Sequence, residues 1–274
     1  RWIIYPIMKK LFGLKYIVTI HGGGLYKWEP YWPLKLFFAN AYSITVVSHR
    51  AKKEYEKRTK KEIIYTPPLI PLQTSSKSIS QLKIKYNLPF DSMVLLYVGS
   101  VRKQKGTDIL LKAFSFFSTN YLQKNNIYLV LAGDGDIRKE LETYYKHTQI
   151  STYFRFLGSI KNENINELYK LADTYIISSH FENTPLSLIE AMFNEKTIIA
   201  ADAPGINNII KNNVNGLVYD KDNPKELYSK LKYILEHREK AKALASNANQ
   251  YYYENYNYED LIKIFMKQFE DAAK

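Results

Sequence analysis

The second half of the chain alternates short apolar runs with longer segments in which apolar residues recur every three or four positions. The apolar runs predict buried strands at 93–99, 127–132, 153–157, 174–178, 197–200 and 217–219. The segments between and after them predict helices near 106–119, 137–147, 163–171, 185–194, 224–236 and 239–253. Strands separated by helices are typical of βαβ units, so we expect a parallel sheet covered by helices on both faces. Ligands of such sheets bind beyond the carboxyl ends of the strands.

The first part of the chain shows the same alternation over fewer elements. Strands are expected at 15–20, 43–48 and 63–66, with the end of a helix over 1–13, a helix from about Pro33 and a basic helix over 49–61. Residues 67–91 contain prolines and a run of small polar residues that break this periodicity. We therefore interpret 67–91 as an interdomain linker with a short helix near 81–86. A last helix is expected over 258–269.

Composition excludes several classes of protein. With 46% hydrophobic and 24% charged residues over 274 positions, the chain is typical of a folded protein of about two domains. It has no cysteine, which excludes disulfides and thiolate metal sites, and its five histidines lack metal-ligand spacing. We therefore expect no structural metal. No apolar run approaches the roughly 20 residues of a membrane-spanning helix.

The net charge of +12 and the isoelectric point near 9.4 predict an anionic partner. Nucleic acid, an anionic membrane surface and a phosphate-rich substrate all fit this charge. No nucleic-acid-binding motif accompanies it, so only the charge favours nucleic acid, and none is expected.

The stretch from Ser178 to Asn194 carries candidate chemistry. Thr184 followed by Pro185 predicts a helix start with a hydroxyl at the N-cap. The helix is apolar except at Ser187, Glu190 and Asn194, which share one face, while Glu182 lies in the loop before it. Two carboxylates near the positive end of a helix suit sugar hydroxyls and phosphate together. The spacing alone equally allows Glu182 and Thr184 to cap a core helix while Glu190 pairs with a lysine.

Two further segments place candidate residues after strands. Arg102, Lys103 and Lys105 precede Gly106 at a predicted helix start, which suits a diphosphate, although these residues by themselves slightly favour a solvated basic loop. His21 ends a strand before Gly22–Gly24, where backbone can approach a ligand. A lone histidine there is more often structural. Aromatic residues follow, and they fit either a core contact or a lipid contact: Trp28, Tyr31 and Trp32.

These motifs resemble those of retaining glycosyltransferases of family 4. The spacing from Glu182 to Glu190 resembles the E-x7-E motif, and the letters PLSLIEAM are similar to the family's usual wording. Lys105-Gly106, followed by LLKAF, is in register with the family's G-R-x-x-x-x-K-G. The sequence departs from that pattern at Ser100, where arginine is usual, and Arg102 is the candidate replacement. The segment around Gly158 resembles the part that approaches the nucleobase.

The resemblance implies transfer of a hexose from a UDP- or GDP-sugar to a saccharide or lipid-linked saccharide, with retention of configuration and no metal cofactor. It implies that Glu190 holds the ribose hydroxyls and that Glu182 contacts the transferred sugar. Lys105 and Arg102 would stabilise the leaving diphosphate, and His21 would lie near the reacting centre. The remaining residues expected to bind donor are Gly99, Ser100, Gly158, Asn183, Thr184, Pro185, Leu186 and Ser187.

The implied fold is α/β and GT-B-like, with two doubly wound parallel-sheet domains. Residues 1–66 would form a partial acceptor-side domain, 92–257 the donor domain, and 258–274 a helix that packs back towards the first domain. The family's opening strands have no counterpart here, so we expect donor binding with little or no transfer. The alternatives are a nucleotide-sugar-binding fragment without turnover and a basic nucleic-acid-binding protein. The expected setting is polysaccharide biosynthesis (lipopolysaccharide or capsule) in the cytoplasm, at the inner face of the membrane.

Overall fold

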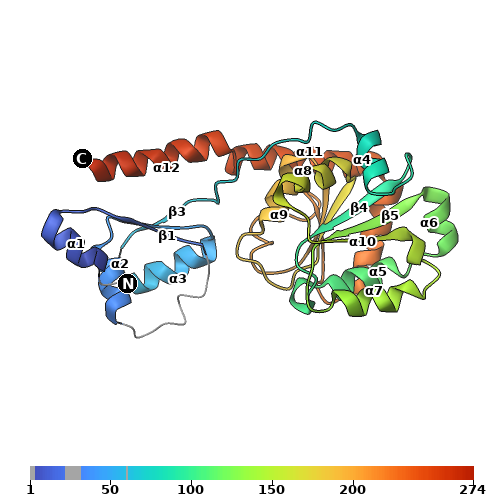
Figure 1. The fold of residues 1–274 in the computed structure, drawn as a ribbon, viewed down its shortest axis with the longest axis horizontal. Coiled ribbons are helices and arrows are strands. Elements are labelled where there is room, and N and C mark those ends of the chain that lie inside the picture. Colours follow the sequence, from blue (N-terminus) through green and yellow to red (C-terminus); the bar gives the residue numbers. More distant parts are fainter. Residues whose placement is uncertain (1–3, 22–31, 60) are drawn as a thin grey trace. The chain divides into compact units, whose positions relative to one another are not determined.

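The chain folds into two compact units (Figure 1). The structure, a computed structural model, describes residues 4–21, 32–59 and 61–274. One unit comprises Arg1–Pro71 with Asn255–Lys274, and the other comprises Leu72–Glu254. The glycines and two of the aromatic residues singled out above lie outside the described residues: Gly22–Gly24, Trp28 and Tyr31.

The first unit contains a three-stranded parallel sheet in the order β1-β2-β3. Its strands are β1 (Ile17–Ile20), β2 (Ser43–Val46) and β3 (Ile63–Tyr65). Its helices are α1 (Ile4–Phe12), α2 (Trp32–Asn40), α3 (His49–Thr59) and α12 (Tyr258–Ala273). The sequence pattern predicts each of these elements. The last helix joins this unit, and the carbonyl of Asp271 accepts a hydrogen bond of 2.9 Å from Tyr42 Oη.

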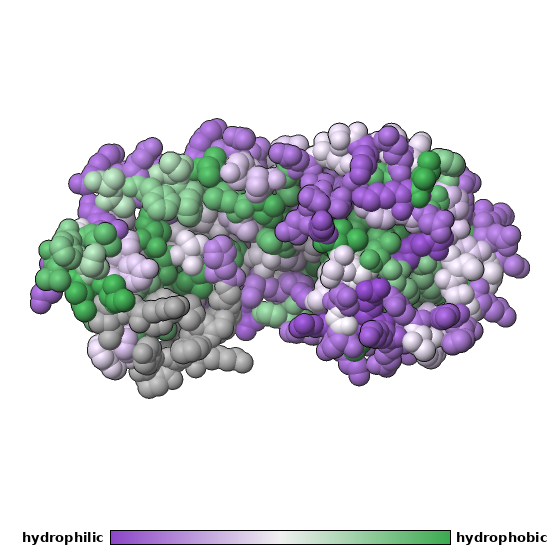
Figure 2. Space-filling view, in the orientation of Figure 1, coloured by the Kyte–Doolittle hydropathy of each residue, from purple (hydrophilic) through white to green (hydrophobic). Residues whose placement is uncertain are grey.

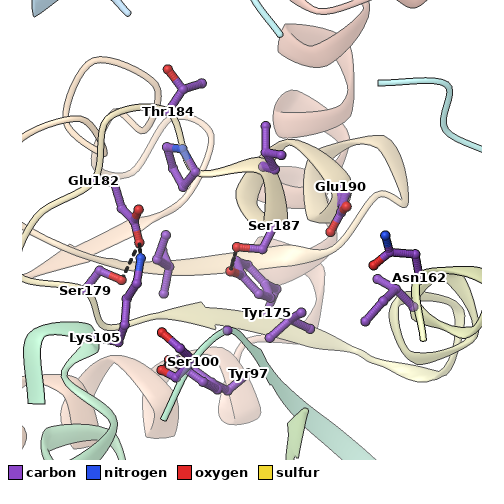
Figure 3. Close-up of a pocket in the computed structure, with 16 residues that line it drawn as sticks. Tyr97, Ser100, Lys105, Asn162, Tyr175, Ser179, Glu182, Thr184, Ser187 and Glu190 are labelled. Atoms are coloured by element: carbon purple, nitrogen blue, oxygen red, sulfur yellow. Dashed lines mark hydrogen bonds and ion pairs between the residues drawn. The ribbon is translucent and has the colours of Figure 1, made fainter. Parts of the chain in front are cut away.

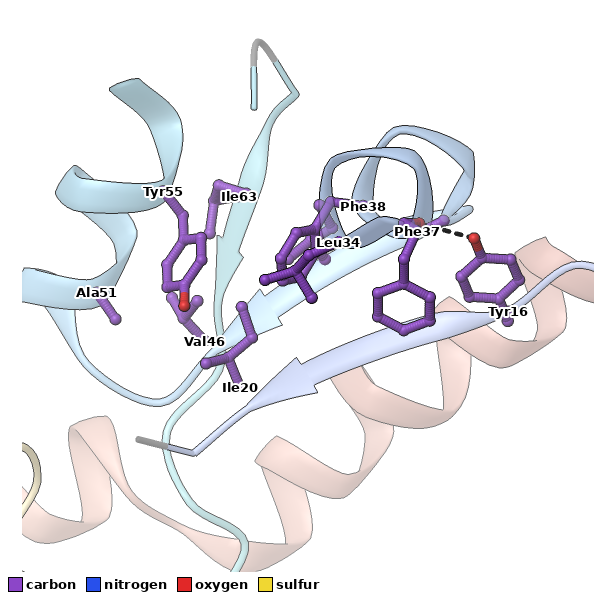
Figure 4. Packing of buried hydrophobic residues seen from close by; sticks show 11 residues of the cluster. Tyr16, Ile20, Leu34, Phe37, Phe38, Val46, Ala51, Tyr55 and Ile63 are labelled. Atoms are coloured by element: carbon purple, nitrogen blue, oxygen red, sulfur yellow. Dashed lines mark hydrogen bonds between the residues drawn. The ribbon is translucent and has the colours of Figure 1, made fainter. Parts of the chain in front are cut away.

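The core of the first unit lies between the sheet and the helices α2 and α3 (Figure 4). Its aromatic rings pack closely: Tyr16 stacks on Phe37 with 5.3 Å between ring centroids. The hydroxyl of Tyr16 would be costly to bury unpaired, and it donates a 2.7 Å hydrogen bond to the carbonyl of Phe37. This contact fixes the start of β1 against α2.

The second unit is built on a six-stranded parallel sheet in the order β6-β5-β4-β7-β8-β9. Its strands are β4 (Met93–Val98), β5 (Ile127–Ala132), β6 (Phe154–Gly158), β7 (Thr174–Ile177), β8 (Thr197–Ala201) and β9 (Leu217–Tyr219). The strand order runs outward from β4 in one direction and from β7 in the other. The crevice between these two strands is therefore the switch point, where doubly wound sheets bind ligands.

Helices cover both faces of this sheet, as the βαβ pattern predicts. They are α4 (Ile79–Lys85), α5 (Thr107–Phe114), α6 (Thr119–Asn125), α7 (Arg138–Lys146), α8 (Asn162–Leu171), α9 (Leu186–Phe193), α10 (Pro224–Glu236) and α11 (Arg238–Asn255), with short 3₁₀ turns η2 (Lys103–Lys105) and η3 (Ser151–Tyr153). Figure 1 shows α5, α7 and α10 on one side and α8 and α9 on the other. The helix predicted over 106–119 is wrong in its extent. It ends at Phe114, and Ser118 caps α6 by accepting from the N–H of Tyr121.

The predicted linker at 67–91 is wrong in its second part, because residues from Leu72 onward belong to the second unit. The buried carboxylate of Glu167 on α8 holds this segment. It accepts hydrogen bonds from Lys77 Nζ at 2.7 Å, Lys85 Nζ at 2.5 Å and Tyr86 Oη at 2.9 Å. The small polar residues of the segment indicated a linker, whereas the partner that orders it is far away in the sequence.

Replacing Glu167 by glutamine is expected to lower the free energy of unfolding by about 2–3 kcal/mol at neutral pH, because two lysines lose their counter-charge. Burial alone would raise the pKa of Glu167, but the hydrogen bonds from Lys77, Lys85 and Tyr86 outweigh it and lower the pKa to about 2. The stabilisation is therefore full above the ordinary pKa of 4.5 and is lost as the pH falls towards 2. Urea unfolding as a function of pH measures this. Glu163→Gln, at an exposed position on α8, is the control, and equal losses in both variants would contradict the prediction.

Candidate functional site

A pocket of about 430 Å³ opens at the switch point of the second unit (Figure 3). The last residues of β4 and β7 and the loops that follow them line it, together with residues of α8 and α9. Its lining residues are Tyr97, Val98, Gly99, Ser100, Lys105, Asn162, Ile165, Tyr175, Ile177, Ser179, Glu182, Thr184, Pro185, Leu186, Ser187 and Glu190. This volume lies within the range of small-molecule sites.

An ion pair lies at one end of the pocket. Lys105 Nζ donates to Glu182 Oε1 at 2.5 Å, and Ser179 Oγ donates to the same oxygen at 2.7 Å. The two charged side chains stay partly accessible, with 28% of Lys105 and 15% of Glu182 exposed. A pair that retains contact with water gives only modest net stability, so a ligand of higher charge can compete for Lys105.

The two loops that carry this pair are fixed to each other through their backbones. Ser178 Oγ donates to the carbonyl of Lys105 at 2.8 Å, and the N–H of His180 donates to the carbonyl of Gln104 at 3.1 Å. Gly106 adopts a left-handed conformation (φ +61°), and a Cβ there would lie 2.0 Å from the carbonyl oxygen of Ser178. Only glycine permits this close approach, so the residue type at position 106 determines where Lys105 stands.

Glu190 lies at the opposite end of the pocket, beside Asn162 in Figure 3. It is half-buried, and burial raises the pKa of its carboxyl group, while a hydrogen bond with Tyr169 opposes the rise. Among the described residues Glu190 forms no ion pair, so the alternative in which it pairs with a lysine is wrong. A carboxylate kept in a half-buried position without a counter-charge is typical of a binding site.

Two buried tyrosines hold α9 in place between these ends. Tyr175 Oη donates to Ser187 Oγ at 2.7 Å, and Tyr169 Oη donates to the carbonyl of Ser187 at 2.9 Å. The helix begins at Leu186, with Pro185 at the N-cap and no side-chain cap. The predicted N-cap at Thr184 is therefore wrong by one residue, because the proline takes the extended cap conformation itself. The first turn of α9 lines the pocket, and helix N-termini favour anions.

The structure brings most of the predicted site residues together and leaves four outside this pocket. Glu182, Glu190, Lys105, Gly99, Ser100, Thr184, Pro185, Leu186 and Ser187 line it. Arg102, Gly158 and Asn183 do not line it, and His21 is an exposed residue of the first unit. Arg102 is exposed where the chain enters η2, outside the lining of this pocket, and its replacement of the cation missing at Ser100 stays a prediction.

Sequence reasoning missed several lining residues. They are Tyr97, Val98, Asn162, Ile165, Tyr175, Ile177 and Ser179. The apolar pattern identified Tyr97 and Tyr175 only as parts of buried strands. It gave no sign that these residues also line a pocket. Ser179 could have been found, because it lies three residues before Glu182 in a loop already singled out.

Two parallel-sheet units, with a pocket at the switch point of the larger one, form an α/β architecture of the GT-B type. The chain belongs to the family described as Glycosyl transferases group 1, which matches residues 78–251. HepE of Anabaena, solved in complex with UDP and glucose, shares this fold with a TM-score of 0.80 and 17% identity. The comparison covers 98% of this chain and 75% of HepE.

Two curated relatives match part of the chain. An uncharacterised glycosyltransferase of Methanocaldococcus jannaschii is 30% identical over 174 residues, which is 63% of this chain and 43% of that protein. The GalNAc-alpha-(1->4)-GalNAc-alpha-(1->3)-diNAcBac-PP-undecaprenol alpha-1,4-N-acetyl-D-galactosaminyltransferase of Campylobacter jejuni is 34% identical over 158 residues, which is 57% of this chain and 42% of that protein. The match thus spans less than half the length of either relative.

In the described parts of the chain, no helix has the length and apolar character needed to cross a bilayer. The same residues contain no cluster of three or more histidine, aspartate or glutamate side chains suited to a metal ion.

Replacing Gly106 by alanine is expected to destabilise the second unit by more than the cost of the left-handed backbone conformation at this position. The left-handed conformation costs a non-glycine residue about 1–2 kcal/mol. Gly13 is the matched control, because its φ is +67° but a Cβ there would meet nothing within 4 Å. In chemical unfolding, Gly13→Ala should lose only the conformational cost and Gly106→Ala about 1–3 kcal/mol more, since the Ser178 carbonyl must move. Equal losses would mean that the close contact is unimportant.

Proposed function

We propose that the second unit binds a nucleoside diphosphate sugar, UDP- or GDP-linked, and that the protein transfers its hexose to a saccharide or lipid-linked saccharide with retention of configuration. The observation that carries the proposal is the order of groups along the pocket. A half-buried carboxylate, a helix N-terminus and a Lys–Glu pair follow one another along it. That order suits a ribose, a diphosphate and a hexose.

The resemblance to family 4 assigns each end of the pocket. Glu190 would accept hydrogen bonds from the ribose hydroxyls, next to Asn162 and Ile165 on α8. The diphosphate would lie at the first turn of α9 and take a charge-assisted hydrogen bond from Lys105. Glu182 would then accept from hydroxyls of the hexose. The solved structure of HepE in complex with UDP and glucose supports this assignment.

In the proposed reaction the bond between the anomeric carbon and the diphosphate oxygen breaks, and the electron pair leaves with the diphosphate. The acceptor hydroxyl oxygen bonds to the anomeric carbon on the same face, and its proton passes to the leaving diphosphate. Lys105 is the one cation among the residues that line the pocket, and it would stabilise the growing negative charge. We assign no metal to this step.

Two parts of the proposal rest on the resemblance alone. His21, at the end of β1, is assigned a place near the reacting centre on the acceptor side. The acceptor is assigned as a saccharide that can be lipid-linked, in line with the undecaprenol-linked saccharide in the name of the Campylobacter jejuni relative.

Glu190→Gln is expected to weaken binding of free UDP and of UDP-glucose alike by about 10- to 100-fold, the worth of a charge-assisted hydrogen bond. Glu182→Gln should weaken only UDP-glucose, because free UDP lacks the hexose. Calorimetric titration of both ligands, repeated with GDP and its sugars, measures this. Equal losses for both ligands in both variants would contradict the assignment of the two ends.

The same Glu190→Gln variant is expected to be more stable than the wild type when empty. Since burial raises the pKa of Glu190, its charged form costs the folded state free energy as the pH rises through that pKa. A stability gain combined with an affinity loss indicates a residue kept for binding. A stability loss would indicate a structural role instead.

We further propose that the first unit associates peripherally with an anionic membrane, at its cytoplasmic face. Apolar residues on one face of α1 are exposed, with Ile4 at 57%, Ile7 at 48%, Leu11 at 67% and Phe12 at 71%. Figure 2 shows hydrophobic residues at the surface over this part of the molecule. The described residues 4–21 and 32–42 contain lysines but neither aspartate nor glutamate. Apolar side chains with nearby lysines suit an anionic lipid surface.

Vesicle sedimentation tests this proposal. The protein should bind vesicles that contain phosphatidylglycerol, more weakly at high salt, and should bind phosphatidylcholine vesicles poorly. Replacing both Leu11 and Phe12 by serine should reduce binding about tenfold or more. Phe90→Ser is the matched control, because Phe90 is 67% exposed but lies in the second unit. Equal binding to both lipids, or an equal loss in the control, would contradict the proposal.

A further inference from the structure

Two adjacent serines follow β7, and each supports a different member of the Lys105–Glu182 pair. Ser178 and Ser179 are 0% and 2% exposed, so their hydroxyl groups need partners within the protein. Ser178 Oγ donates to the backbone carbonyl of Lys105 at 2.8 Å, whereas Ser179 Oγ donates to the carboxylate of Glu182 at 2.7 Å. Ser178 therefore holds the backbone of Lys105, and Ser179 holds the side chain of Glu182.

We infer that Ser179 is a positioning residue that keeps Glu182 directed at the hexose when the donor's diphosphate engages Lys105. This inference rests on the proposed function. In the structure Glu182 Oε1 accepts hydrogen bonds from both Lys105 Nζ and Ser179 Oγ. A diphosphate draws Lys105 towards itself and repels the carboxylate. The hydrogen bond from Ser179 survives this exchange, because the serine is neutral and buried.

The position of Ser179 supports this role. The loop that follows the serine is fixed by backbone contacts: the N–H of His180 donates to the carbonyl of Gln104, and the N–H of Glu182 donates to the carbonyl of Pro204 at 3.0 Å. The hydroxyl group therefore does not need to anchor the loop. Its remaining function is to hold the Glu182 carboxylate. This contact affects only the end of the pocket that is proposed to bind the hexose.

Ser178 provides a matched control on the same strand end. It contacts no side chain of the ion pair, but it supports the backbone at Lys105 and the close approach of Gly106. Ser178→Ala should therefore weaken every ligand that uses Lys105, with or without a sugar. Ser179→Ala should weaken only the ligand that uses Glu182.

The test is calorimetric titration of the full chain and its variants with UDP and UDP-glucose, and with GDP and GDP-glucose. Ser179→Ala should bind the nucleoside diphosphate within about twofold of wild type and the sugar-linked form about tenfold more weakly. Ser178→Ala should lose similar affinity for both. Adding Ser179→Ala to Glu182→Gln should change affinity little further, because the two act through one carboxylate. Unchanged binding of the free nucleotide also shows that the variant is folded.

The remaining outcomes of the titrations contradict either the positioning role of Ser179 or the proposed function. Equal losses for both ligands in Ser179→Ala, no loss for either, or losses that add to those of Glu182→Gln would overturn the positioning role while leaving the proposed function standing. A wild-type chain that binds none of the four ligands would overturn the proposed function and, with it, this inference.

Discussion

The contact between Lys105 and Glu182 is the interaction on which the site depends, because it joins the loops that follow the two central strands. The register of β4 with β7 sets the distance between those loops, with Leu95 opposite Thr174 and Leu96 opposite Tyr175. Backbone hydrogen bonds between the loops and the close approach at Gly106 then fix the pair. The reversal of strand order between β4 and β7 therefore places a preorganised pocket at this point of the parallel sheet.

Two groups of ion pairs in the second unit, one around Glu167 and one formed by Lys105 and Glu182, differ in burial, and this difference separates their roles. Glu167 is 7% exposed at the side chain and accepts from three donors, so removing it leaves lysines without a counter-charge. The pair of Lys105 and Glu182 is more exposed and lines a pocket, so its energy is small enough for a ligand to redistribute. The first group orders the segment that leads to β4, whereas the second is available for binding.

The sequence predicted the sheet well because its central strands, β4, β5, β7 and β8, are largely buried on both faces and read as nearly continuous apolar runs. Likewise, the E-x7-E spacing and the Lys105-Gly106 pair indicated residues that do meet in one pocket. Contacts between distant positions were not predictable in this way. The partner of Lys77 and Lys85 lies on α8, and the hydroxyl of Tyr175 meets Ser187 only after folding. The exposed position of Arg102 depends on the path of η2, which no periodicity encodes.

A crystal structure of the chain with UDP-glucose tests the central claim most directly. The account predicts the ribose at Glu190, the diphosphate at the first turn of α9 and within hydrogen-bond distance of Lys105 Nζ, and the hexose at Glu182, still held by Ser179. A donor bound elsewhere would contradict the proposed binding mode. So would a donor bound in this pocket with the Lys105–Glu182 contact unchanged and no protein group in contact with its diphosphate.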